Sequence, residues 1–94
     1  MGYQPQPADL SGIILDQEIR DSIDKIARNV HEVWALERLD QGWRYGESMS
    51  RGEKTHPSLV PYDELPEKEK VLDVKTTEQV IKMLLHLGFR IEKG

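Results

Sequence analysis

The chain has 94 residues and no cysteine, and its 13 basic and 17 acidic side chains give a net charge of −4. This length fits a single domain, 1–94, and the absence of cysteine excludes disulfide bonds and cysteine–zinc sites. Because there is no basic stripe, no signal peptide and no apolar run near the ~18–20 residues that cross a bilayer, we expect a soluble, cytoplasmic protein without a nucleic-acid polymer or a membrane as partner.

Residues 1–15 are predicted to form an extended N-terminal arm. Pro5 and Pro7 fix their own φ and move the residue before each of them away from the helical region. The apolar run at 13–15 has little reason to be in water. We therefore expect this arm to pack on the folded body.

A long helix is predicted from about Asp16 to Leu39. Asp16 is a suitable N-cap because its carboxylate can accept hydrogen bonds from free amides of the first turn. Apolar residues then recur at spacings of three and four, which places them on one face of a helix. They are Ile19, Ile23, Ile26, Ala27, Val30, Val33 and Trp34.

Residues 41–64 have neither helical nor strand periodicity and are punctuated by glycine and proline. They nevertheless hold Trp43, Tyr45 and Tyr62, half of the aromatic residues of the chain. Loops longer than ~12–15 residues in compact domains are often functional. We therefore predict a long ordered aromatic loop, with at most a very short strand at Leu59 and Val60.

Two helical segments are predicted after the loop. Pro66 fits the first position of a helix, and Thr76 followed by Gln79 fits a capping box that would begin a final helix. Gly88 fits the left-handed residue that ends a helix. Apolar and polar residues alternate at 89–92, which would suit a short C-terminal strand.

These elements predict a mainly α domain of two antiparallel helices, with the loop draped across one end and at most very short β-strands. The helix from Asp16 would pack on the helix that ends at Leu87. The centre of the core is expected at eight apolar positions on these helices. They are Ile23, Ile26, Val30, Trp34, Val80, Ile81, Leu84 and Leu85.

Five stretches of the chain resemble the repeat domain of ryanodine receptors. They are NVHEVWA at 29–35, GWRYG at 42–46, HPSLVPY at 56–62, LPEKEK at 65–70 and LGFRI at 87–91. Their order and spacing agree with that family from residue 3 to residue 91, so the chain is similar to a single free-standing copy. The resemblance implies a helical fold with a structured loop and no catalytic activity. It also implies a homodimer, because the receptors carry these domains as tandem pairs with approximate two-fold symmetry.

The half of the loop that ends at His56 is the only part of the chain with a net positive charge, and it is the candidate ligand site. Trp43 and Tyr45 would form a wall on which a planar ring stacks, or would pin the loop to the helices. Arg44, Lys54 and His56 would receive a phosphate or carboxylate, or would be solvated charges balanced by acidic neighbours. The resemblance adds that nucleotide-like ligands have been proposed for family members.

Two departures from the family pattern bear on this site. Met49, Ser50 and Arg51 stand where many members have an arginine followed by acidic residues. Leu72 stands where an aromatic residue often precedes the aspartate, here Asp73. If the missing charges help to hold a ligand in other members, this chain is expected to bind a different ligand or none.

The sequence patterns indicate neither catalysis nor a metal or cofactor. His31, His56 and His86 lack the short spacing of metal ligands, and His31 is expected to have a hydrogen-bonded structural role beside the apolar face. There is no Gly-rich phosphate loop and no G-x-S-x-G motif. We therefore expect a non-catalytic binding module that senses a small anionic, nucleotide-like ligand. The alternative is a homodimeric assembly module with no small-molecule ligand.

Overall fold

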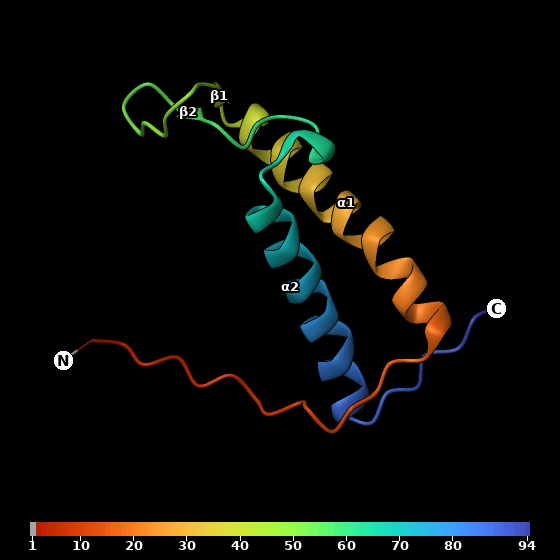
Figure 1. Cartoon of the computed structure of the whole chain (residues 1–94). Helices are drawn as coiled ribbons and strands as arrows, with labels where there is room; N and C mark the ends of the chain where they lie inside the picture. The colour runs from red at the N-terminus through yellow and green to blue at the C-terminus, as the bar shows by residue number, and fades with distance from the viewer. Residues whose placement is uncertain (1) are drawn as a thin grey trace.

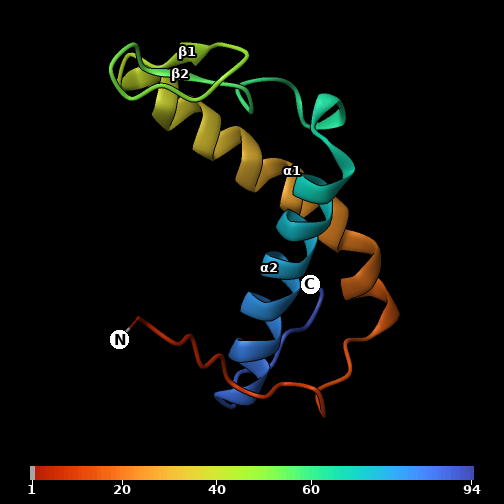
Figure 2. The same cartoon turned by 60° about the vertical axis from the view of Figure 1, so that its left-hand side comes forward.

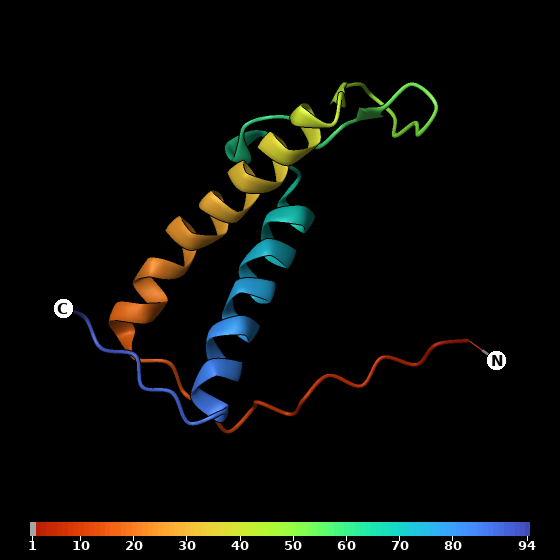
Figure 3. The ribbon, with the colours of Figure 1, turned by 180° about the vertical axis from the view of Figure 1, so that it is seen from behind.

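The computed structural model describes residues 2–94 of the chain. Its elements are, in order, α1 (Gln17–Asp40), β1 (Arg44–Tyr45), β2 (Thr55–His56), the 3₁₀ turn η1 (Tyr62–Glu64) and α2 (Glu67–His86). Figures 1 and 3 show the chain running along α1 and returning along α2 in the opposite direction, with the strands beyond the C-terminal end of α1. The prediction of a mainly α fold with very short strands is confirmed.

α1 begins where the sequence predicts it. The carboxylate of Asp16 accepts a hydrogen bond from the Ile19 N–H at 3.0 Å, so one free amide of the first turn is satisfied. The observed helix lies within one residue of the predicted bounds at each end. An acidic cap at the positive end of the helix dipole therefore fixes where the arm stops and the helix starts.

The C-terminal end of α1 is closed by the loop that follows it. Gly42 adopts a left-handed φ of 91°, which lets the Trp43 N–H donate to the Arg38 carbonyl at 3.0 Å. Lys54 reaches back from the loop, and its Nζ donates to the Gln41 carbonyl at 2.8 Å. A positive charge is favourable at this negative end of the helix dipole, so Lys54 ties the loop to the helix.

β1 and β2 form a two-stranded parallel sheet inside the loop. Arg44 pairs with Thr55, and Tyr45 pairs with His56. Gly46 follows β1 at a point where an added Cβ would lie 2.5 Å from the Thr55 Cβ. The approach of the two strands therefore requires a residue without a side chain at this position.

Replacing Gly46 by alanine should destabilise the protein by about 1–3 kcal/mol, the usual cost of an overpacked site. Thermal unfolding followed by circular dichroism measures this loss. Gly52→Ala is the matched control, because a Cβ at Gly52 would have nothing within 4 Å. Equal melting temperatures for the two variants would contradict the close approach of β1 and β2.

The two strands predicted elsewhere are wrong. Leu59 and Val60 lie in an irregular stretch, where the Val60 carbonyl accepts a hydrogen bond from the His31 Nε2 at 2.8 Å. A side chain, and not a neighbouring strand, thus satisfies that backbone group. Residues 89–94 have no regular structure, and Phe89 is 61% exposed. Alternation alone does not make a strand where no partner strand is in reach.

α2 is one continuous helix, whereas the sequence suggested two segments. The capping box expected at Thr76 is wrong, because Thr76 lies in the middle of the helix. Its neighbour Thr77 is buried, and the Thr77 Oγ1 donates to the Asp73 carbonyl one turn earlier at 2.9 Å. No glycine or proline interrupts the helix after Pro66, so it continues until Gly88, which has a left-handed φ of 98°.

The buried core lies on a different side of the helices from the predicted one. Ala27, which is fully buried, forms its centre with Tyr62 and Leu65, and Val60 and Val74 pack against them. Of the eight predicted core residues only Ile23 is buried. The others are half-buried or exposed: Ile26, Val30, Trp34, Val80, Ile81, Leu84 and Leu85. The reason is that the η1 turn, with its large Tyr62 ring, covers one side of the helix pair, while no described element covers the other.

The N-terminal arm contacts the body through two leucines. Leu10 and Leu15 are 6% and 2% exposed, whereas Ile14 is 84% exposed. Residues 2–9 are exposed, and Figures 1 and 2 show them leading away from the helices. The packing expected for the arm is therefore limited to the part that directly precedes α1.

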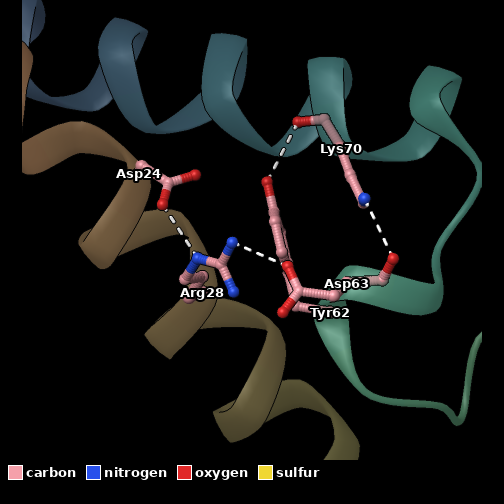
Figure 4. A network of polar contacts seen from close by, with 5 residues as sticks. All are labelled: Asp24, Arg28, Tyr62, Asp63 and Lys70. Carbon is pink, nitrogen blue, oxygen red and sulfur yellow. Dashed lines mark hydrogen bonds and ion pairs between the residues drawn. The ribbon is translucent and has the colours of Figure 1, made fainter.

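A polar network joins α1, η1 and α2 (Figure 4). The Arg28 guanidinium pairs with Asp63 at 2.7 Å and with Asp24 at 2.8 Å, and it lies 4.9 Å from the centre of the Tyr62 ring. Lys70 Nζ donates to the Asp63 carbonyl at 3.0 Å. The hydrogen bond from Arg28, together with its charge, lowers the pKa of Asp63 below the ordinary value of 3.8.

Acid should remove the contribution of the Arg28–Asp63 pair to stability. The pKa of Asp63 is lower in the folded chain than its ordinary value of 3.8, so the pair stabilises the fold fully above about pH 3.8. This stabilisation is lost as the pH falls through the pKa of Asp63 in the folded chain. The Arg28 side chain is partly exposed and that of Asp63 is largely exposed, so the effect is small. Urea unfolding at several pH values should therefore show a small stability difference between the wild type and Asp63→Asn that disappears in acid. A difference that stays constant in strong acid would contradict this assignment.

Candidate functional site

A groove runs along the side of the helix pair that the core leaves open. Its central part, of about 270 Å³, is lined mainly by apolar residues of both helices. They include Ile26, Val30, Leu72, Thr76, Val80 and Ile81. Towards the end of α2 it continues into a hollow of about 300 Å³, which shares Ile26 and Ile81 and adds Ile19 and Ile91. The other residues that line this hollow are polar or charged: Asp16, Glu18, Ser22, Glu92 and Lys93. We call this continuous surface the apolar groove.

A second hollow, also of about 270 Å³, lies where the apolar groove meets the loop. It is lined by Val30, His31, Trp34, His56, Ser58, Leu65, Glu69, Leu72 and Asp73. We call it the aromatic hollow. Because it shares Val30, Leu72 and Asp73 with the apolar groove, the two surfaces are continuous.

Three rings are held against one another at the aromatic hollow. Trp34 stacks on His31 with ring centres 5.7 Å apart, and His56 meets Trp34 edge to face at 5.1 Å. His31 is 6% exposed, and its Nε2 donates to the Val60 carbonyl at 2.8 Å. The Ser58 N–H donates to the His56 Nδ1 at 3.0 Å, so neutral His56 carries its proton on Nε2. The expected structural role of His31 thus fits the geometry, and hydrogen bonds to the backbone hold both histidine rings in place.

Two carboxylates of α2 give this hollow its electrostatic character. Glu69 accepts a hydrogen bond from the Ser58 hydroxyl at 2.7 Å, and Asp73 follows one turn later on the same helix face. Within residues 2–94, neither carboxylate has an ion-pair partner, and no lysine or arginine lines the hollow. The aromatic hollow therefore favours positive charge.

The five residues predicted as a ligand site do not line one hollow. The Lys54 ammonium is engaged at the Gln41 carbonyl, and Arg44 Nη1 donates to the Glu53 carbonyl at 3.3 Å. His56 alone among the five lines the aromatic hollow. Lys54 and Arg44 thus stabilise the loop by donating hydrogen bonds to backbone carbonyls.

Trp43 and Tyr45 lie in different surroundings. The Trp43 ring is half-buried and its centre is 6.4 Å from that of His56. Tyr45 is 53% exposed and, with Arg44, lines a separate hollow of about 370 Å³, which we call the loop hollow. Its other lining residues are Glu32, Ala35, Leu39, Leu59, Val60 and Pro61. The two rings form no common wall, because Trp43 still belongs to the turn that closes α1, while Tyr45 lies in β1.

Sequence reasoning missed most residues of the aromatic hollow. The sequence predicts no role for Glu69 or for the Asp73 carboxylate, although their spacing of four places them on one helix face. His31 and Trp34 have a spacing of three, which likewise puts their rings side by side. The signal was present as two spacings, one in each helix, but nothing in the sequence says that these faces meet.

The fold and the groove define a small, mainly helical module with a long loop and an uncovered face between its helices. The RyR domain family matches residues 3–93, essentially the whole chain, and the chain belongs to this family. The resemblance carried by the five sequence stretches is thereby confirmed. Within residues 2–94, no helix is both long and apolar enough to cross a membrane, and no three His, Cys, Asp or Glu side chains are grouped to hold a metal ion.

Proposed function

We propose that the chain is a non-catalytic assembly module in which a second copy covers the apolar groove. The observation that carries this proposal is the exposure of the groove residues. Ile26, Val30, Leu72 and Val80 are 40%, 51%, 61% and 59% exposed. Apolar surface in water costs on the order of 25 cal/mol per Å², and monomers rarely keep contiguous apolar patches above a few hundred Å².

The dimensions of the chain indicate that it exposes more surface than a compact monomer of its size, which supports a partner. Its radius of gyration is 16.2 Å, whereas a compact domain of this length has about 12 Å. It exposes 7587 Å², whereas a compact monomer of 10.9 kDa exposes about 5600 Å². The extended arm at residues 2–9 and the open groove both contribute to this excess. A standard interface buries about 800 Å² of each partner, so the exposed surface is sufficient for one.

A second copy is the partner that these features favour. Interfaces between identical subunits are more apolar than other interfaces, and a two-fold axis lets the same groove face itself. The resemblance to the receptor repeats, which occur in two-fold pairs, supports the same arrangement. Pairing would also supply the core that the described helices lack on this side.

Sedimentation velocity over a range from low to high micromolar concentration tests the proposal. We expect a species of twice the 10.9 kDa chain mass, with dissociation only at the lowest concentrations. A species of one chain mass throughout would contradict self-assembly.

Ligand sensing at the loop is a second candidate, and one observation favours it. Arg44 and Tyr45 lie together at the loop hollow, so a planar anionic molecule would have a guanidinium and an exposed ring beside it. Calorimetric titration with a panel of nucleotides tests this idea, with Arg44→Gln as the comparison. Absence of heat at millimolar nucleotide, or equal binding by Arg44→Gln, would exclude it.

A further inference from the structure

The aromatic hollow carries two carboxylates and an indole ring, which an anionic ligand would not use and which an apolar contact between two copies does not explain. We propose that it binds a guanidinium group, presented by an arginine side chain or by a free guanidine compound. The proposal goes beyond the assembly function, and it rests on the acceptors, the ring and the charge of the hollow. It reverses the charge of ligand that the sequence had suggested.

The hollow presents hydrogen-bond acceptors whose capacity is only partly used among the described residues. The Asp73 carboxylate has no ion-pair partner within residues 2–94, and only one oxygen of Glu69 is engaged, by the neutral Ser58 hydroxyl. His31 donates through Nε2, which leaves its Nδ1 as an acceptor with no hydrogen-bond partner among the described residues. These groups come from both helices and line the same hollow. A ligand rich in N–H donors would satisfy them.

The Trp34 ring favours a cation that is also flat. Indole attracts a cation through its ring quadrupole more strongly than other side-chain rings do. Guanidinium is planar, is weakly hydrated for an ion, and can donate two parallel hydrogen bonds to one carboxylate. A guanidinium in this hollow would therefore have the indole ring and the Glu69 and Asp73 carboxylates among its neighbours. An ammonium group lacks the flat face and the paired donors.

Other classes of ligand fit this hollow less well. A phosphate or carboxylate would be repelled by Glu69 and Asp73, since no cationic side chain lines the hollow to compensate them. A metal ion would need several ligands in one cluster, and within the described residues no three suitable side chains are so grouped. The acceptors and the ring together thus select an organic cation.

Titration with N-acetyl-arginine amide, followed by the indole N–H resonances in a ¹H–¹⁵N spectrum, tests the proposal. Trp34 lines the hollow and Trp43 does not, so the two indoles serve as probe and internal control. We expect a saturable shift of the Trp34 resonance, with a much smaller shift for Trp43. N-acetyl-citrulline amide, which has the same shape without the charge, should give no saturable shift. Equal shifts with both compounds, or none with either, would overturn the proposal.

Charge-removing variants locate the binding site. Asp73→Asn should weaken binding by about tenfold or more, the loss expected for one charge-assisted hydrogen bond. Asp73→Asn is cleaner than Glu69→Gln because Glu69 also accepts the Ser58 bond. Glu67→Gln removes the same charge from an exposed position of α2 that does not line the hollow. Equal weakening in both variants would mean that only the net charge matters, which would also overturn the proposal.

Two further comparisons identify the source of the group and separate this proposal from self-assembly. Methylguanidine that binds as well as the arginine amide would support a free guanidine compound, whereas preference for the amide would support an arginine of a polypeptide.

Val80→Glu alters the apolar groove outside the hollow. We expect this variant to lose assembly and to keep the Trp34 shift. Loss of both would overturn guanidinium binding as an independent property.

Discussion

Replacing Tyr62 by alanine should cost about 3–5 kcal/mol of stability, as removal of a buried aromatic side chain usually does. Tyr62 is 5% exposed and belongs to the small core that joins η1 to both helices. A protein of this size has a total stability of about 5–14 kcal/mol, so the change removes a large fraction of it. Thermal unfolding should show a melting temperature lower by more than about 10 °C.

Tyr62→Phe separates the ring from its hydroxyl. The hydroxyl donates to the Lys70 carbonyl at 3.4 Å, a long hydrogen bond, so its loss should cost no more than about 1 kcal/mol. Burial raises the pKa of Tyr62 above the ordinary value of 10.0, so ionisation in the unfolded chain should weaken the wild type as the pH rises above 10.0. The phenylalanine variant should lack this part of the alkaline loss. If Tyr62→Ala and Tyr62→Phe had the same melting temperature, the ring would not be the centre of the core.

Replacing Val80 by glutamate should prevent assembly. Val80 lies in the middle of the apolar groove and is 59% exposed in the single chain. A carboxylate that loses its water at an apolar interface is strongly unfavourable, and two-fold symmetry introduces it twice. We expect the dissociation constant of the pair to rise by at least about 100-fold, which corresponds to about 3 kcal/mol. Sedimentation equilibrium at several concentrations measures this change.

Val71→Glu is the matched control for that experiment. Val71 is on the same helix and is 55% exposed, but it lines neither the apolar groove nor the aromatic hollow. It should therefore leave the dissociation constant nearly unchanged. If Val71→Glu prevented assembly and Val80→Glu did not, the interface would lie on another side of the helices.

The helices could be read from the sequence because their signals are local. Asp16 caps α1 through its own carboxylate. Gly88 follows the end of α2 because glycine readily adopts the left-handed conformation that terminates a helix. Both signals depend only on neighbours within one or two turns. The wrong prediction that a helix starts at Thr76 has the same origin, because a capping box is also a local pattern. In the structure Thr76 lies inside the continuous helix α2.

The position of the core could not be read in the same way. Apolar periodicity identified a helix face that includes Val30 and Val80, but it does not say what covers that face. In the single chain the η1 turn packs at Ala27 instead, and that contact joins residues far apart in the sequence. The mismatch between apolar pattern and burial is itself the strongest motive for a second copy.

The loop site was predicted from composition, which does not say which residues line a common hollow. The basic and aromatic residues of the loop indicated a ligand, yet Lys54 and Arg44 satisfy backbone carbonyls. The aromatic hollow depends on Trp34 and Glu69, which come from separate helices, and only the fold brings them together. Of the predicted residues, His56 alone has a place in it.

Solvent accessibility of methyl groups tests the central claim, that the apolar groove is covered in the assembled protein, most directly. Methyl spectra with a soluble paramagnetic agent should show Ile26, Val30 and Val80 shielded at high protein concentration. Ile14 and Leu36, which are 84% and 61% exposed and lie outside the groove, should remain accessible under the same conditions. If the groove methyls were broadened as strongly as those of Ile14 and Leu36 at every concentration, the groove would be open to water and the account would fail.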